Sequence, residues 1–69
     1  MNFADKVKMV RYELGLSQEK IAAKLGVSFS TINRWERGHS FPSYTAQLRF
    51  EEFCKENNID LSKLDKGGN

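Results

Sequence analysis

The side chains best suited to chemistry lie in one short stretch of the chain. Ser30, Asn33 and Arg34 occupy positions i, i+3 and i+4, so a helix over this segment would carry them on one side. Hydroxyl, amide and guanidinium groups form hydrogen bonds with the edges of DNA bases; Asn suits adenine and Arg suits guanine. The plain alternative is that all three belong to a solvated polar helix face.

No comparable set of catalytic or metal-binding residues is found in the sequence. We find no nucleophile beside a base, no paired carboxylates in a plausible cleft and no phosphate-binding glycine loop. One histidine, His39, and one cysteine, Cys54, cannot supply the four ligands of a zinc site. We therefore predict that the protein is not an enzyme and uses no cofactor or metal.

The size and composition of the chain predict a single small globular domain. It has 69 residues, of which 39% are hydrophobic and 29% are charged. A single cysteine cannot form an internal disulfide, which argues against a stapled secreted scaffold. No apolar run approaches the roughly 20 residues that cross a bilayer, and the N-terminus lacks a signal-peptide core. We expect a protein of the cytoplasm without membrane contact.

Charge is distributed unevenly along the chain. The net charge is +2, but residues 20–50 carry five basic residues against one acidic residue, whereas residues 51–65 carry two basic residues against five acidic ones. A basic middle segment suits a surface that meets an anion. Uneven charge on an ordinary solvated surface is the alternative that charge alone favours.

The spacing of apolar residues predicts short helices. Phe3, Val7, Val10 and Leu14 form one helical stripe, and Gly15 follows at a typical helix end. Ser17 is a good cap for a second helix that ends before Gly26, with Ile21, Ala22 and Leu25 as its apolar face. Ser28 caps a third helix over 29–37, ended by Gly38. Its candidates for facing inward are Ile32 and Trp35, with Glu36 as a third.

A fourth helix is predicted after the only proline, Pro42. Ser43 is its expected cap, the helix runs to about residue 57, and its buried stripe is Ala46, Phe50, Phe53 and Cys54. Residues 59–64 are expected to form one more turn, and residues 65–69 a flexible tail. The fold class is therefore all-α, a compact bundle of four to five short helices.

The second and third helices form a helix-turn-helix pair. A turn of three or four residues containing Gly26 joins them, and Ala22 is small enough to let the two helices cross closely. With Ile32 and Trp35 packed inward, the third helix presents a polar, positively charged face. An α-helix with such a face fits the major groove of DNA.

This sequence resembles the phage-repressor type of helix-turn-helix domain, the Cro/CI-like or XRE-like family with the lambda-repressor-like fold. The resemblance spans about residues 3–60. It rests on Arg11, Leu14-Gly15-Leu16-Ser17-Gln18, Ala22, Leu25-Gly26-Val27-Ser28, Ile32, Trp35-Glu36-Arg37-Gly38 and Pro42-Ser43.

The resemblance implies which residues contact double-stranded DNA. Within the domain (1–64) and its helix-turn-helix segment (18–37), the family's base-reading positions correspond to Ser30, Asn33 and Arg34. Gln18 corresponds to a residue that touches a phosphate or braces the recognition helix. The expected DNA-binding residues are Gln18, Ser28, Phe29, Ser30, Asn33, Arg34, Arg37, His39 and Ser40. For Arg37, His39 and Ser40 the family's contacts are with the sugar-phosphate chain, and a plain loop histidine is the simpler interpretation of His39.

Arg11 and Glu36 correspond to a pair that often forms a partly buried salt bridge in this family, so we expect a structural role for both. Phe29 is unusual at a position where many members are polar. It could pack on a thymine methyl group, or fold back onto Pro42 or the second helix. Cys54 is expected to be a buried core thiol.

Taken together, the family resemblance implies a sequence-specific regulator of transcription, a repressor type, in the cytoplasm of a bacterium or phage-infected cell and associated with the nucleoid. The alternative is an antitoxin-like protein-interaction module with the same fold. A homodimer on DNA is expected, because one small domain buries too little surface for high specificity. Tyr44, Leu48, Leu61 and Leu64 could form a dimer patch, or could be scattered surface residues.

Overall fold

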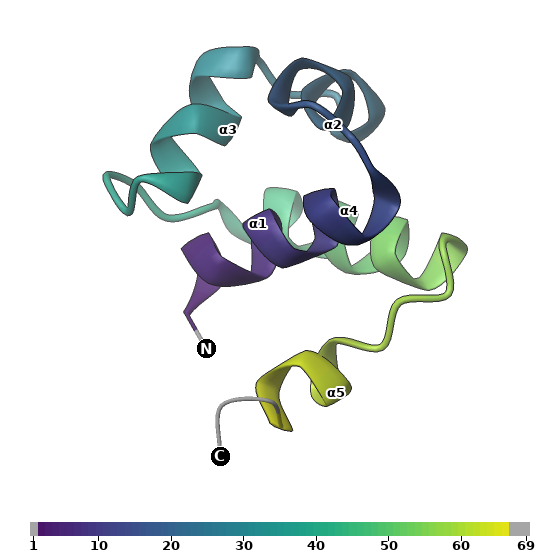
Figure 1. Ribbon diagram of the computed structural model, residues 1–69. Coiled ribbons are helices and arrows are strands. Elements are labelled where there is room, and N and C mark those ends of the chain that lie inside the picture. The colour runs from purple at the N-terminus through teal and green to yellow at the C-terminus, as the bar shows by residue number, and fades with distance from the viewer. Residues whose placement is uncertain (1, 67–69) are drawn as a thin grey trace.

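The protein is a bundle of short helices, as the apolar spacing predicts. The computed structural model describes the backbone of residues 2–66 and the side chains of residues 2–63. Within these residues every regular element is a helix (Figure 1). The elements are α1 (Phe3–Leu14), α2 (Gln18–Leu25), α3 (Phe29–Glu36), α4 (Tyr44–Glu56) and α5 (Leu61–Lys66). The predicted all-α class is confirmed.

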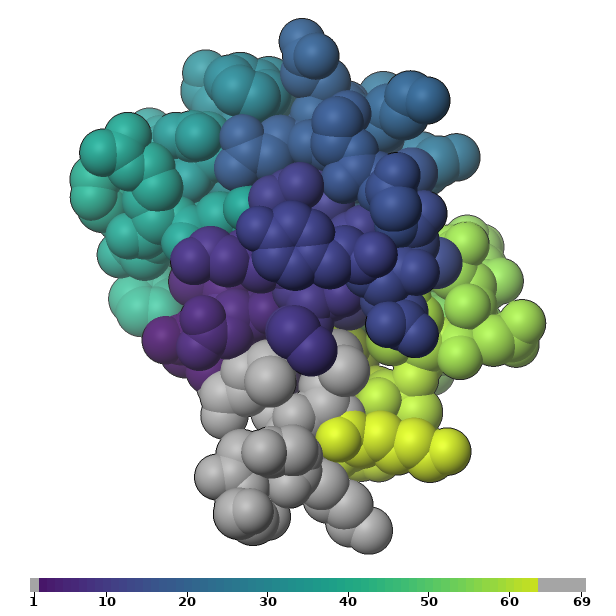
Figure 2. Space-filling model, viewed as in Figure 1, coloured from purple at the N-terminus to yellow at the C-terminus, as the bar shows by residue number. Residues whose placement is uncertain are grey.

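The α2–α3 pair occupies one end of the molecule and α5 the other (Figure 1). Helices α1 and α4 cross the middle, where α1 contacts both α3 and α5, and α4 contacts α2. From the side shown in Figure 2, α1 covers the centre of the surface, between the α2–α3 end and the C-terminal part. This arrangement supports α3 from within and leaves its outer side uncovered.

The boundaries of the helix-turn-helix pair follow from local capping. Ser17 starts α2 by accepting a hydrogen bond from the N–H of Lys20 at 3.1 Å, and Ser28 starts α3 in the same way from Thr31 at 3.1 Å. Between them, Gly26 ends α2 with φ of 71°. An L-residue with a side chain is strained in this left-handed conformation, which is why glycine is suited to the turn.

The core contains the apolar stripes of the four longer helices. Phe3 joins three of them, because its ring packs edge-on against Trp35 at 5.2 Å and Phe50 at 5.3 Å between ring centroids. Ile32 is fully buried in this core. The buried apolar residues are Val7, Val10, Ile21, Ala22, Leu25, Ile32, Trp35, Phe50, Phe53 and Cys54.

Three helix ends differ slightly from their predicted positions. Helix α3 ends at Glu36, one residue early, because Gly38 adopts φ of 74° and the N–H of His39 turns back to the carbonyl of Arg34 at 2.9 Å. Helix α5 begins at Leu61 rather than at residue 59. The carboxylate of Asp60 accepts the N–H of Ser62 at 3.0 Å, and Ile59 packs against the core instead. The tail was predicted to start at residue 65, but α5 continues to Lys66, and residues 67–69 of the predicted tail lie outside the described residues.

Candidate nucleic-acid interface

The outer face of α3 carries most of the predicted base-reading side chains. Ser30 and Arg34 are exposed, and Phe29 at the start of the helix is 50% exposed. On the opposite side of the same helix, Ile32 is 0% and Trp35 is 3% exposed. The helix is therefore anchored by one side and available to a partner on the other, as a helix that enters a groove must be.

Asn33 is less free than the sequence indicated. The helical pattern placed it outward with its neighbours, but it is half-buried, and its Nδ2 donates a hydrogen bond to Oε1 of Gln18 at 3.3 Å. It lies at the border of the outer face, where α3 meets the start of α2. The amide group of Asn33 therefore makes a hydrogen bond within the protein, while the residue remains partly exposed at the surface.

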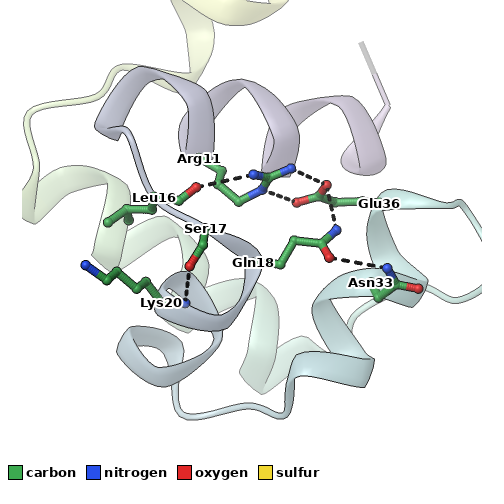
Figure 3. A network of polar contacts seen from close by, with 7 residues as sticks. All are labelled: Arg11, Leu16, Ser17, Gln18, Lys20, Asn33 and Glu36. Atoms are coloured by element: carbon green, nitrogen blue, oxygen red, sulfur yellow. Dashed lines mark hydrogen bonds and ion pairs between the residues drawn. The ribbon is translucent and has the colours of Figure 1, made fainter.

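Gln18 belongs to a polar network that connects three helices (Figure 3). Its Nε2 donates to Oε1 of Glu36 at 3.0 Å. Arg11 on α1 meets the same carboxylate twice, through Nε to Oε2 at 2.7 Å and Nη2 to Oε1 at 2.9 Å. The remaining Nη1 group of Arg11 donates to the carbonyl of Leu16 at 3.2 Å. This fork-shaped pairing fixes the end of α3 against α1 and the α1–α2 turn.

The electrostatics of this network follow from its burial. Desolvation alone would raise the pKa of Glu36, but hydrogen bonds from Arg11 and Gln18, together with the charge of Arg11, outweigh it and lower the pKa. The same hydrogen bond to Glu36 raises the pKa of Arg11 against the opposing effect of burial. Both groups are therefore charged over the physiological pH range.

Ser28 is occupied by its capping role. Its hydroxyl oxygen accepts from the N–H of Thr31 and also lies 2.9 Å from the hydroxyl oxygen of Thr31. The side chain of Ser28 remains exposed at the start of α3. A contact of Ser28 with DNA would thus compete with, or add to, an existing hydrogen bond.

The three predicted residues beyond α3 follow the end of the helix. Arg37 is the C-cap residue and is exposed, His39 is exposed, and Ser40 is half-buried. Arg37 directly follows α3, and the left-handed turn at Gly38 precedes His39 and Ser40. The predicted interface thus covers α3 and the start of the following loop.

A comparison with known protein families agrees with this geometry. A family model described as Helix-turn-helix matches residues 7–64 of the chain. This chain belongs to the Cro/CI-type helix-turn-helix family. Members of this family are DNA-binding transcription regulators, so a DNA-binding role of this general kind follows. Neither a search of curated proteins nor one of solved structures gave a significant match to this helix-turn-helix protein.

Two contributors to the site of this helix-turn-helix protein were not singled out from its sequence. The backbone carbonyl of Leu16 accepts from Arg11, and the ring of Tyr12 lies 4.8 Å from the guanidinium carbon of the same residue. A signal for the first was available: a buried guanidinium has five N–H groups, and one carboxylate cannot satisfy them all. The ring contact has no such signal.

The end of this helix-turn-helix protein opposite the α2–α3 pair contains a hollow and a buried thiol. A hollow of about 520 Å³ between α4 and α5 is lined in part by Cys54, Ile59 and Leu61. Cys54 is a buried free thiol, as predicted. Of the residues suggested for a dimer patch, Leu61 is half-buried and packs against the core, whereas Tyr44 and Leu48 are exposed. The side chain of Leu64 lies outside the described residues.

Neither a metal centre nor a membrane span is found in the described part of this helix-turn-helix protein. Among residues 2–63, no three His, Cys, Asp or Glu side chains lie together so as to hold a metal ion. No helix of the described residues has the length and apolar character to cross a bilayer.

Proposed function

We propose that the protein binds double-stranded DNA sequence-specifically and regulates transcription, with α3 inserted into the major groove. The observation that supports this most strongly is the two-sidedness of α3: Ile32 is fully buried, whereas Ser30 and Arg34 are exposed on the same eight-residue helix. In this proposal Arg34 pairs with a guanine, and Ser30 and Asn33 contact neighbouring bases. A domain of residues 1–64 with its helix-turn-helix at 18–37 would carry the whole activity.

The residues around α3 would fix the position of the helix on the duplex. Arg37 is exposed directly beyond α3, where a guanidinium can meet a phosphate. His39 and Ser40 follow in the same loop, and Gln18 and Ser28 stand at the starts of α2 and α3, where backbone N–H groups suit an anion. Phosphate contacts of this kind strengthen binding to every sequence and weaken it steeply with salt.

We further propose that two copies bind together on one face of the DNA. Half-sites about 34 Å apart, one helical turn, would then give a two-fold symmetric operator. We also propose that the protein acts as a repressor at the nucleoid, in a bacterial or phage cytoplasm. Paired binding to a two-fold symmetric operator is consistent with this role. Sedimentation with and without a palindromic duplex tests the dimer, and a strict monomer in both conditions would contradict it.

Selection of bound duplexes from a random pool tests the proposed function. The wild-type protein should enrich one short sequence with half-site symmetry. Arg34→Ala should relax selection at one base pair and weaken binding by about 1–3 kcal/mol, whereas Arg37→Ala should weaken binding to all sequences about equally and lower its salt dependence. A pool that stays unselected at low salt would refute sequence-specific binding.

A protein-interaction module, antitoxin-like, is the second candidate function. The 50% exposed ring of Phe29 on the outer face of α3 and the acidic segment after residue 50 favour it. Arg34→Glu separates the two candidates. The charge reversal should abolish DNA binding if α3 reads DNA, and should leave a complex with a protein partner intact if that complex depends on the ring of Phe29 and the acidic segment.

A further inference from the structure

The hydrogen bonds between Glu36, Gln18 and Asn33 all run in one direction. Asn33 donates from Nδ2 to Oε1 of Gln18 at 3.3 Å, and Gln18 donates from Nε2 to Oε1 of Glu36 at 3.0 Å (Figure 3). The chain of donors ends on a carboxylate that also receives two hydrogen bonds from Arg11. A relay with a fixed direction therefore connects an ion pair inside the protein to a side chain at the border of its candidate interface.

The charge of Glu36 dictates this direction. Glu36 is 5% exposed and is held ionised by Arg11, so its oxygens can only accept hydrogen bonds. The amide of Gln18 must therefore turn its NH₂ group toward Glu36. Rotating the amide of Gln18 by half a turn would place its Oε1 against an oxygen of Glu36. Two acceptors that face each other in a poorly solvated position raise the free energy of the folded state. The carbonyl oxygen of Gln18 is left facing α3.

The orientation of Asn33 follows from that of Gln18. An acceptor on Gln18 requires a donor on Asn33, so one N–H of Nδ2 is used within the protein. Oδ1 of Asn33 has no hydrogen bond within the described residues, and no side-chain oxygen there is both buried and unpartnered, so this atom reaches solvent. Figure 3 shows it directed away from Gln18. Asn33 thus presents an acceptor to whatever lies against α3.

We propose that Gln18 is a positioning residue for sequence specificity, which transmits the charge of Glu36 to Asn33. The relay makes Asn33 select a base with an exocyclic amino group in the major groove, adenine or cytosine. Guanine and thymine offer O6 and O4 acceptors at the corresponding positions, which would oppose Oδ1. Adenine fits best, because its N7 can accept the second N–H of Nδ2. This inference rests on the proposed binding of DNA.

Selection from a random duplex pool, repeated with variants, tests the relay. Asn33→Ala first identifies the base pair that Asn33 contacts, as the position whose preference disappears. Gln18→Met retains the length of the side chain but neither donates nor accepts as an amide. We expect the wild type to favour adenine or cytosine there by about fivefold or more, and Gln18→Met to reduce this preference to about twofold or less. Selection at the base pair assigned to Arg34 should persist.

Two further variants make the result specific. Gln47→Met is the matched control, because exposed Gln47 lies on α4 and, within the described residues, its Nε2 donates to the carbonyl of Pro42 alone, at 3.4 Å; it should leave every preference unchanged. Gln18→Ala repeats the test with a shorter side chain in case the methionine packs in a new way. Thermal unfolding shows that each variant is folded before selection.

The outcomes separate the relay from the proposed function. If the wild type selects no sequence, DNA recognition itself fails. If the wild type selects a sequence but Asn33→Ala changes no preference, or the selected base is guanine or thymine, the relay is wrong. A Gln18→Met protein that binds all sequences more weakly with its preferences intact would assign Gln18 to a phosphate or to stability, and would also overturn the inference.

Discussion

Arg11 and Glu36 face each other across two parallel hydrogen bonds of 2.7 and 2.9 Å, although twenty-four residues separate them in the chain. Their side chains are 15% and 4% exposed, so both charges lie largely out of water. The pair joins α1 to the last turn of α3, and Gln18 attaches α2 to the same carboxylate. The end of α3 is therefore held by a charge pair rather than by apolar packing alone.

Removing one partner of this pair should destabilise the protein strongly. Arg11→Met leaves the Glu36 carboxylate buried without its cation, and breaking buried pairs in this way costs about 3–5 kcal/mol. For a domain this small, that is a large share of the whole free energy of unfolding. Urea unfolding of the wild type and the variant measures the loss.

The double variant Arg11→Met with Glu36→Leu is the control for this prediction. It removes both charges and fills the space with apolar groups, so it should be more stable than Arg11→Met alone. Additive losses in the double variant would show that the two residues act independently, and would contradict the interpretation of the pair.

The stability of the protein should fall in acid because of Glu36. Its pKa in the folded protein lies below the ordinary value of 4.5, so the folded state binds the proton less tightly than the unfolded state does. The stabilisation is therefore complete above about pH 4.5 and is lost as the pH falls through the lowered pKa. Urea midpoints measured from pH 7 to pH 3 should show this loss.

Glu36→Gln provides the reference for this pH profile. Exposed Asp60 also has a lowered pKa, owing to hydrogen bonds from Ser62, and acts in the same direction in both proteins. The difference in urea midpoint between wild type and Glu36→Gln isolates the contribution of the buried Glu36 carboxylate. That difference should shrink as the pH falls below about 4.5, and a constant difference would count against the ionised pair.

Much of the fold could be predicted from the sequence because its signals are local. The spacing of Phe3, Val7 and Val10 requires one helical face, and a glycine such as Gly26 ends a helix wherever a left-handed residue is needed. Helix α5 was misplaced by two residues because its start depends on a hydrogen bond of Asp60 and on the packing of Ile59, which no short pattern encodes.

The candidate site was less predictable because it depends on contacts between helices. Helical periodicity places Asn33 outward beside Arg34, and the distinction between them appears only when α2 brings Gln18 within 3.3 Å of Asn33. Similarly, the carbonyl of Leu16 becomes part of the network only because the α1–α2 turn folds back on Arg11. A periodic pattern predicts which residues share one face of a helix, but not which residues of other helices contact that face.

Cys54 should react with thiol reagents only when the protein opens. Burial, assisted by the negative charge of Glu51, raises the pKa of the thiol from 9.0 to about 11, and the side chain is 1% exposed. At pH 8 the lower thiolate fraction alone slows the reaction by about 100-fold relative to unfolded protein. Absorbance with a disulfide reagent, in buffer and in denaturant, gives the two rates. Equal rates would show that α4 and α5 do not enclose the thiol.

Phe29 should contribute to base recognition if its ring meets a thymine methyl group. Replacing thymine by deoxyuridine at the contacted position removes one methyl, worth about 0.8 kcal/mol or roughly fourfold in Kd. The wild type should lose this affinity, whereas Phe29→Ala should bind both duplexes equally. Competition binding on the selected operator gives, for each protein, the ratio of the Kd values for the deoxyuridine and thymine duplexes.

Phe41→Ala provides the matched control for Phe29, because Phe41 is also an exposed aromatic residue, at 86%, but lies in the loop beyond α3. It should retain the full sensitivity to the thymine methyl. Equal losses for the wild type and Phe29→Ala would place the methyl against another residue. The 50% exposed ring of Phe29 would then be free for a protein partner, and the antitoxin-like alternative would gain support.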